Sequence, residues 1–217
     1  MDPLIVHALA KVSAKPEAAG KDVQAALESL RAAGPQSDEE SRAVAFMMSM
    51  APESKSQLFQ DLWALWASGL KSGGYFVEFG AASGVEISNT WLLEKKLGWT
   101  GLLAEPNPVF FDSLTANRSC AVSNKCVYTR TGDRMEFLAS KVPEFSGLAS
   151  VVAGDNHEEK RRRKAHTIEV ETISLEDLLV EHGALRTIDF LSVDTEGSEF
   201  DILAGFDFGR WDIRAIA

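Results

Sequence analysis

The stretch Tyr75–Glu105, YFVEFGAASGVEISNTWLLEKKLGWTGLLAE, decides the fold. It opens with an apolar run that predicts a short buried strand, emerging near Glu78. A glycine-spaced turn, Gly80–Gly84, follows and leads into a helical pattern at three- to four-residue spacing, formed by Ile87, Trp91 and Glu94. Residues 101–104 predict a second short strand that ends at Glu105. Strand, turn, helix and strand in this order form the crossover unit of a parallel sheet.

The same stretch predicts a binding site for a nucleoside-bearing cofactor. Glycines at a strand-to-helix turn remove Cβ atoms, so a ligand can lie against the backbone, and a helix N-terminus offers free N–H groups. An acid at the end of the second strand can accept hydrogen bonds from both ribose hydroxyls, and Glu105 occupies that position. The competing interpretation is an ordinary strand–helix turn without a ligand.

The spacing of the glycines favours one cofactor over another. A dinucleotide site has the pattern G-x-G-x-x-G, whereas this turn has G-x-x-x-G with Ala82 at the middle glycine position. A carboxylate at Glu78 would repel a diphosphate but suits the ammonium and sulfonium groups of S-adenosylmethionine. An NAD-type oxidoreductase and a non-catalytic module remain as alternatives.

From about Ser56 to Ala217 the chain resembles methyltransferases of the FkbM type. The resemblance rests on motifs that follow one another in order: Ser56-Gln57, Gln60-Asp61, FVEFGAASG (76–84), Ser88-Asn89-Thr90, Leu93-Glu94-Lys95, LGWTGLLAEPNP (97–108), Asn117-Arg118, Ser146-Gly147 and VDTEGSEFDIL (193–203). It implies a class I S-adenosylmethionine-dependent methyltransferase, often one that methylates hydroxyls of sugars or natural products. One departure is Ala82-Ser83, where the family commonly has an acid before the second glycine.

The fold implied is an α/β, Rossmann-like three-layer sandwich with a mostly parallel sheet. Residues 73–217 would form the S-adenosylmethionine-binding domain, preceded by an N-terminal helical segment over residues 1–72. The resemblance implies a sheet of seven strands, whereas the sequence accounts for about five. We therefore expect the C-terminal strands to be missing or supplied by another chain, with an unpaired edge at Ile213–Ala217.

The candidate site residues follow from the strand ends and the resemblance. The expected cofactor-binding residues are Glu78, Gly80, Ala81, Ser83, Gly84, Ser88, Asn89, Thr90, Glu105, Pro106 and Asp194. Asp194 and Glu196 are the candidate general bases for an acceptor hydroxyl, with His157 as a rival. Together with Glu199, these two acids could instead hold Mg²⁺ or cap the helix that follows.

Two other segments allow both a structural and a functional interpretation. The run Leu58–Trp66 is apolar over a wide arc, so we expect it to be buried against the sheet or a second subunit. Gln57, Gln60 and Asp61 beside it are either helix-start residues or a lid over the cofactor. The charged run EEKRRRK (158–164) predicts a solvated helical turn, or else a basic lid that recruits an anionic acceptor.

Composition narrows the class of protein. The 217 residues carry a formal net charge of −10, and the pI near 4.9 argues against nucleic acid as a partner. No apolar run approaches the ~18 residues of a membrane span, and the N-terminus lacks a signal-peptide pattern. Two cysteines are too few for a disulfide scaffold. These features predict a soluble cytoplasmic protein. The resemblance implies an enzyme with a small-molecule acceptor, and a homo-oligomer remains open.

Overall fold

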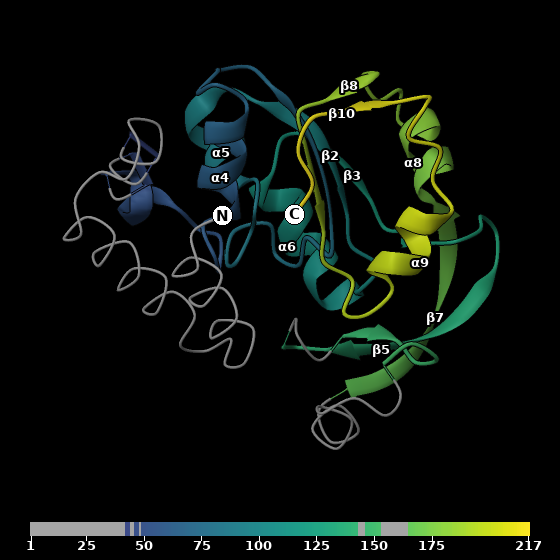
Figure 1. Cartoon of the computed structure of the whole chain (residues 1–217). Helices are drawn as coiled ribbons and strands as arrows, with labels where there is room; N and C mark the ends of the chain where they lie inside the picture. The colour runs from purple at the N-terminus through teal and green to yellow at the C-terminus, as the bar shows by residue number, and fades with distance from the viewer. Residues whose placement is uncertain (1–41, 44–45, 48, 143–145, 153–164) are drawn as a thin grey trace, which may run out of the picture.

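The structure is a three-layer α/β sandwich with a second four-stranded sheet below it (Figure 1). The computed structural model describes residues 42–43, 46–47, 49–142, 146–152 and 165–217. Most of the N-terminal helical segment predicted over residues 1–72 therefore lies outside the described residues.

The central sheet is parallel and runs in the order β3-β2-β1-β9. Its strands are β1 (Tyr75–Phe79), β2 (Thr100–Ala104), β3 (Ala121–Ser123) and β9 (Phe190–Val193). β1 is buried along its whole length, as expected for a strand covered on both faces. The mostly parallel α/β fold predicted from the sequence is thereby confirmed.

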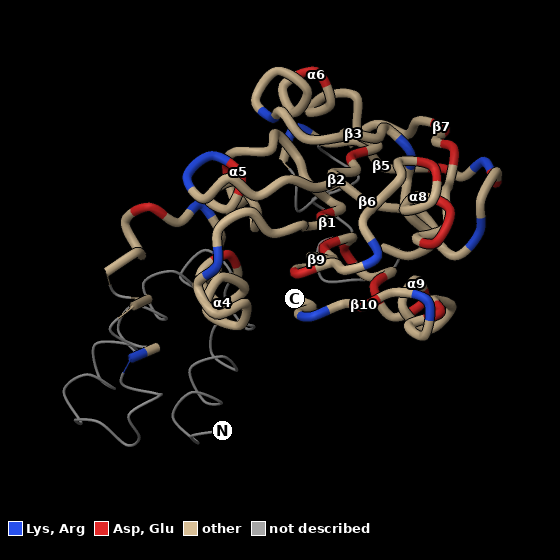
Figure 2. The backbone as a smooth tube through the Cα atoms, turned by 90° about the horizontal axis from the view of Figure 1, so that it is seen from above, with Lys and Arg blue, Asp and Glu red and all other residues tan. Residues whose placement is uncertain are grey.

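Helices cover both faces of this sheet. The helical elements are η2 (Ala51–Glu53), α4 (Gln60–Ala67), α5 (Trp91–Leu97), α6 (Pro108–Asn117), α8 (Leu175–Glu181) and α9 (Glu199–Ala204). Phe76 of β1 packs in the core cluster that contains residues of α4, α5 and α6, whereas Val77 and Phe79 pack with residues of α8 and α9. The alternation of side chains along a strand thus divides the core between two layers, which are seen from above in Figure 2.

The apolar run around α4 is buried against the sheet, as predicted. Leu62 and Leu65 are buried, and Leu65 belongs to the same core cluster as Phe190 of β9. Trp63 remains 40% exposed, and its ring meets that of Phe190 edge-on at 6.4 Å.

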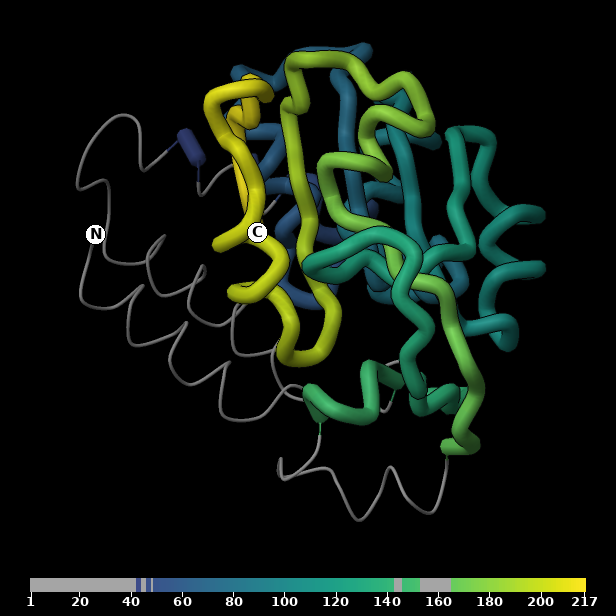
Figure 3. Tube along the Cα trace, turned by 90° about the vertical axis from the view of Figure 1, so that its right-hand side faces the viewer, coloured from purple at the N-terminus to yellow at the C-terminus, as the bar shows by residue number. Residues whose placement is uncertain are grey.

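The second sheet has the order β4-β7-β5-β6 and extends below the three layers in the side view (Figure 3). Its strands are β4 (Cys126–Tyr128), β5 (Arg134–Ser140), β6 (Gly147–Leu148) and β7 (Ala165–Ser174). β7 pairs parallel with β4 and antiparallel with β5. Residues 166–173 alternate apolar and polar side chains, the pattern typical of a half-exposed strand such as β7. Ser174 caps α8 by accepting the N–H of Asp177.

The helix expected to follow the glycine turn directly is absent there. Ile87 has a left-handed φ of 54°, and α5 begins only at Trp91. Residues 85–90 instead form a loop whose polar groups bind the carboxylate of Glu78. The prediction that a helix N-terminus would point at the ligand from this turn was therefore wrong.

The C-terminal residues lie along one side of β8 (Thr187–Ile188) and β9. β10 (Asp212–Ile213) pairs parallel with β8, and an isolated parallel bridge joins Leu191 to Ile216. The segment Ile213–Ala217, which we expected to be an unpaired strand edge, is thus hydrogen-bonded to β8 and β9 on the side that faces these strands. Among the described residues, no helix has the length and apolar character needed to cross a membrane.

Candidate functional site

One cavity opens where β1, β2 and β9 end, as expected for a parallel α/β sheet. The second sheet and the segment before α4 complete its walls. It is lined by Gln57, Phe79, Gly80, Ala82, Ile87, Ala104, Glu105, Pro106, Phe110, Lys125, Cys126, Val127, Phe137, Ser146, Gly147, Leu148, Asp194, Thr195, Glu196 and Ser198.

Gly80 forms a bare-backbone floor between the ends of β1 and β9. Its φ is +80°, and a Cβ atom there would lie 1.8 Å from the carbonyl oxygen of Asp194. Its N–H donates to the carbonyl of Ala104 at 3.1 Å, which ties the turn to the end of β2. Only glycine combines this backbone conformation with so close an approach.

Glu105, at the end of β2, is the best-defined polar group of the cavity. Its side-chain oxygens accept the backbone N–H groups of Ala82 and Asn107, each at 2.8 Å. The residue is only 5% exposed, and burial raises the pKa of this carboxyl to about 7 although both hydrogen bonds lower it. A carboxylate has about four lone-pair positions, so two hydrogen bonds leave room for further donors.

Asn107 explains why Glu105 keeps one orientation. Asn107 is fully buried, and its amide donates to the carbonyl of Ser140 at 2.8 Å and to the hydroxyl of Ser146 at 3.1 Å. Its side-chain oxygen accepts the N–H of Val109 and so caps α6. The acid, the start of α6 and the second sheet are therefore joined through one residue, whose backbone N–H binds Glu105 and whose side chain binds the other two.

The walls beside Glu105 are apolar. Val127, Phe137 and Leu148 are each at most 5% exposed, and all three line the cavity. Burial raises the pKa of the Cys126 thiol to about 12, so this side chain contributes an uncharged group to the cavity lining. A flat, uncharged group fits such a surface better than a charged one.

The β9 end of the cavity carries two further acids, Asp194 and Glu196. Glu199 is used differently, because its carboxylate accepts the backbone N–H groups of Thr195 and Gly197 at 2.9 and 3.0 Å. Partial burial raises the pKa of Glu199, but these backbone hydrogen bonds outweigh it and lower the pKa overall. In the described ranges, no three His, Cys, Asp or Glu side chains are grouped as a metal site requires.

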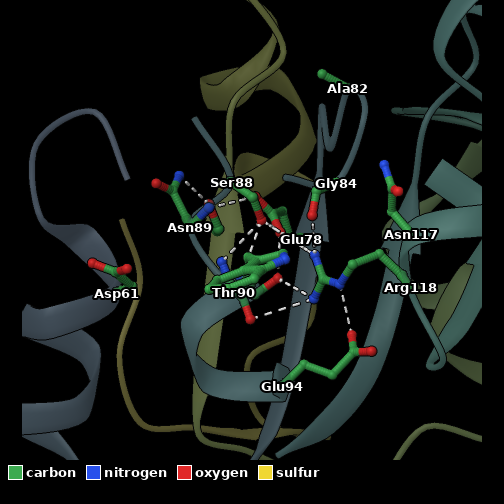
Figure 4. Close-up of polar contacts among 12 residues, drawn as sticks. Asp61, Glu78, Ala82, Gly84, Ser88, Asn89, Thr90, Glu94, Asn117 and Arg118 are labelled. Atoms are coloured by element: carbon green, nitrogen blue, oxygen red, sulfur yellow. Dashed lines mark hydrogen bonds and ion pairs between the residues drawn. The ribbon is translucent and has the colours of Figure 1, made fainter. Parts of the chain in front are cut away.

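Glu78 does not line the cavity, although the sequence analysis placed it among the cofactor-binding residues. Its carboxylate is buried and accepts the N–H of Asn89 at 2.8 Å and the hydroxyls of Ser88 and Thr90 (Figure 4). Burial raises the pKa of Glu78, while the nearby Arg118 and these hydrogen bonds oppose that shift. The carboxylate thus holds the 85–90 loop.

Arg118, which follows α6, completes this buried cluster. Its fully buried guanidinium donates to Glu94 at 2.7 Å and to the carbonyl of Gly84 at 3.2 Å, and it lies 3.9 Å from Glu78. It also donates to the carbonyl and hydroxyl of Thr90 at 3.3 and 3.0 Å. The charge of Glu78 is therefore balanced inside the protein, and the predicted effect of that charge on a cofactor loses its structural basis.

The predicted site residues separate into two groups. Those that line the cavity are Gly80, Glu105, Pro106, Asp194 and Glu196. Those that lie away from its lining are Glu78, Ala81, Ser83, Gly84, Ser88, Asn89, Thr90 and Glu199. His157 and the charged run at 158–164 lie outside the described residues.

Sequence reasoning missed most of the apolar lining. Phe137 and Leu148 belong to the second sheet, whose place beside the cavity depends on long-range pairing of β5 with β7. The Asn-Pro pair after Glu105 was a usable signal, because Asn is a preferred helix cap and Pro is favoured at the first helical position.

Comparisons with known proteins show which family the chain belongs to. The chain is 27% identical over 141 residues to a protein named "Methyltransferase 1" from Beauveria bassiana (strain ARSEF 2860). This alignment covers 57% of the chain and 56% of the relative, so the chain spans about half the length of this curated protein. No solved structure matches the chain. The family model for the methyltransferase FkbM domain matches residues 78–217, more than half of the chain, and the protein therefore belongs to the FkbM methyltransferase family.

Proposed function

We propose that this protein uses S-adenosylmethionine to methylate a hydroxyl group of a small molecule, a sugar or a natural product. The observation that carries the proposal is Glu105, a buried acid at the end of β2 whose carboxylate is oriented by two backbone N–H groups. In parallel α/β folds this position suits the hydroxyls of a ribose.

The cavity fits an adenosyl group on chemical grounds. Val127, Phe137 and Leu148 offer an apolar surface for a base, and Glu105 offers acceptors for the adjoining sugar. Gly80 lets the ends of β1 and β9 approach each other closely at the floor of the cavity, because a Cβ there would lie 1.8 Å from the carbonyl oxygen of Asp194. These residues would hold the donor, and the sulfonium supplies an already activated methyl group when it is bound.

The same geometry disfavours a dinucleotide. The turn at Gly80–Gly84 is separated from the first residue of α5, Trp91, by a loop, so no helix N-terminus adjoins it to bind a diphosphate. This supports the methyl-donor proposal over the oxidoreductase alternative.

The acceptor is proposed to bind at the β9 end, next to Asp194 and Glu196. Either carboxylate could take the hydroxyl proton as general base, since both line the cavity. Because methyl transfer from a sulfonium needs little covalent help, alignment of the acceptor oxygen would be the main task of this end. The sugar or natural-product class of the acceptor rests on the family resemblance.

Binding and turnover test the proposal separately. Calorimetry should detect binding of S-adenosylhomocysteine and no comparable binding of NAD. Incubation with labelled S-adenosylmethionine and a panel of hydroxyl acceptors should transfer label to at least one of them. Tight binding of NAD without binding of S-adenosylhomocysteine would refute the proposal, and donor binding without transfer to any hydroxyl would favour the non-catalytic alternative.

A further inference from the structure

We propose that Gln57 binds the carboxylate of the amino-acid part of the methyl donor, which extends the proposed function and rests on it. Gln57 lies outside the residues matched by the family model, yet it lines the cavity. Within the described part of the chain, its side-chain amide forms no hydrogen bond. A residue that lines a cavity and whose side-chain amide has no protein partner can bind a ligand there.

The segment around Gln57, residues 54–59, is fixed before any ligand arrives. The carboxylate of the fully buried Asp61 accepts the hydroxyl of Ser54 at 2.7 Å and the N–H of Lys55 at 3.4 Å. The N–H of Asp61 in turn donates to the hydroxyl of Ser56 at 3.1 Å. Gln57 therefore belongs to a braced segment, and ordering it on binding would cost little.

The same segment is joined to the loop after the glycine turn. Ser56 forms a parallel bridge with Ile87, and its hydroxyl donates to the carbonyl of Ser88 at 3.3 Å. The next residue, Asn89, donates from its amide to the hydroxyl of Ser192 on β9 at 2.9 Å. These contacts place the segment on the β9 side of β1.

Glu105 lies on the other side of β1, because the sheet order is β3-β2-β1-β9. If Glu105 holds the ribose, the base lies with the apolar walls beside it and the amino-acid part extends across β1 toward β9. Gln57 is then next to the amino-acid part rather than next to the base.

The chemistry of the lining leaves the donor carboxylate few partners. Glu105, Asp194 and Glu196 are carboxylic acids, and an ionised carboxyl group accepts hydrogen bonds but offers a carboxylate no donor. The ammonium of Lys125 is paired with Glu181 at 2.9 Å and lies 3.6 Å from Glu171, on the far side from β9. The hydroxyl of Ser198 donates to Thr195 at 2.8 Å. The amide N–H groups of Gln57 are neutral donors that suit a carboxylate in such an acidic setting.

The test compares two ligands that differ in the amino-acid part. S-adenosylhomocysteine carries that part, whereas 5′-methylthioadenosine lacks it and keeps the base and the ribose. Calorimetry with both ligands would be run on the parent protein, Gln57→Leu, Gln57→Glu and the matched control Gln60→Leu. Gln60 lies outside the cavity lining, and its side-chain oxygen accepts the N–H of Leu58 at 2.8 Å.

We expect Gln57→Leu to weaken S-adenosylhomocysteine binding roughly tenfold to a hundredfold, the effect of losing a hydrogen bond to a charged group. Binding of 5′-methylthioadenosine should stay unchanged. Gln57→Glu, nearly the same shape, should weaken S-adenosylhomocysteine binding more than Gln57→Leu does, because two carboxylates would then face each other. Gln60→Leu should leave the ratio of the two dissociation constants as in the parent protein.

Three results would overturn the inference. If Gln57→Leu lost affinity for both ligands equally, Gln57 would only shape the cavity wall and would not contact the amino-acid part. If binding of both ligands were unchanged, Gln57 would not belong to the site. Tighter binding of S-adenosylhomocysteine by Gln57→Glu would indicate contact with the donor ammonium instead. If the parent protein bound neither ligand, the proposed function itself would fail, and the inference with it.

Discussion

Glu78 and Glu105 stand at or near the ends of adjacent strands, and both are buried acids, yet their surroundings differ in one decisive respect. Glu78 has a guanidinium 3.9 Å away and hydrogen bonds from the 85–90 loop. Glu105 has two backbone N–H partners and lines the cavity. Burial raises the pKa of both carboxyls, so a perturbed pKa alone does not distinguish them.

The difference shows how a buried acid can serve structure or binding. Glu78 has its hydrogen-bonding capacity filled by the chain itself, and its charge is opposed by Arg118. Glu105 accepts only two backbone N–H groups and can still accept further hydrogen bonds, and its pKa is raised by burial and lowered by those two backbone donors. We therefore expect changes around Glu78 to reduce stability and changes at Glu105 to reduce binding.

The largest effect is expected from Arg118→Met. This substitution removes the guanidinium that lies between Glu78 and Glu94. Both carboxylates then lose their positively charged partner in the protein interior. Breaking a buried ion pair in this way costs about 3–5 kcal/mol of unfolding free energy. Urea unfolding followed by circular dichroism would measure the loss.

The control for this variant is the double change Arg118→Met with Glu78→Gln. Neutralising Glu78 should recover part of the lost stability, since one uncompensated charge is then gone. If the double variant were less stable than Arg118→Met, the charge of Glu78 would not be the reason Arg118 is needed.

The next effect is expected from Glu105→Gln on donor binding. The amide keeps the shape but loses a charged acceptor, and its NH₂ group must face a backbone N–H of Ala82 or Asn107. Affinity for S-adenosylhomocysteine should fall about thirtyfold, the scale of a charge-assisted hydrogen bond. Calorimetry would measure it.

Glu78→Gln is the matched variant on the adjacent strand. It should lower the urea midpoint while weakening S-adenosylhomocysteine binding far less than Glu105→Gln does. A stable Glu78→Gln protein with equally weak donor binding would break the comparison and return Glu78 to the cofactor site.

The sequence predicted those features that depend on neighbouring residues. The buried strand at β1, the turn at Gly80 and the Ser174 cap each follow from local pattern, and all three are present. Glu105 was also placed correctly, directly after a strand and beside the cavity. The carboxyl ends of parallel strands lie at the same edge of a sheet, which is where ligands bind.

The features that the sequence did not predict depend on contacts between distant residues. The helix expected around Ile87 is replaced by a loop because Arg118, some thirty positions later, binds the carbonyls of Gly84 and Thr90. Pairing at this separation leaves no periodic signal in the sequence. Residues 187–193 likewise form two strands, β8 and β9, which are separated at Asp189, whose carboxylate accepts the N–H of Tyr75 at 2.9 Å.

A smaller effect is expected from pH. The pKa of Glu105 is about 7 in the free protein, and ribose hydroxyls bind the ionised form, so donor affinity should rise with pH through 7. If only the carboxylate form binds, affinity increases about tenfold from pH 6 to pH 8. Calorimetry across this range would measure it, and Glu105→Gln should show a flat profile. A parent profile as flat as that of the variant would remove Glu105 from the ribose site.

The same raised pKa affects the stability of the free protein in the opposite direction. Because the folded protein holds the Glu105 proton more tightly than the unfolded chain, the contribution to stability is full below about pH 4.5. It is lost as the pH rises through about 7. Donor binding and apo stability at this residue should therefore change with pH in opposite senses.

The smallest effect is expected from Ser88→Ala. The Ser88 hydroxyl donates to Glu78 at 3.2 Å and accepts the N–H of Trp91 at 3.2 Å. The residue is 2% exposed, so losing this hydroxyl should cost about 1 kcal/mol of unfolding free energy. Ser119→Ala, at an exposed serine that Lys95 contacts at 3.4 Å, should cost less than about 0.5 kcal/mol.

The value of Ser88→Ala lies in what it should leave unchanged. Its hydroxyl belongs to the Glu78 cluster and lies away from the cavity lining, so affinity for S-adenosylhomocysteine should match that of the parent protein. A Ser88→Ala protein that kept its stability but lost donor binding would mean that Ser88 itself, and not only Ile87 of the same loop, contacts the ligand. The division between a structural acid at Glu78 and a binding acid at Glu105 would then fail at its weakest point, because the Glu78 cluster would itself be part of the site.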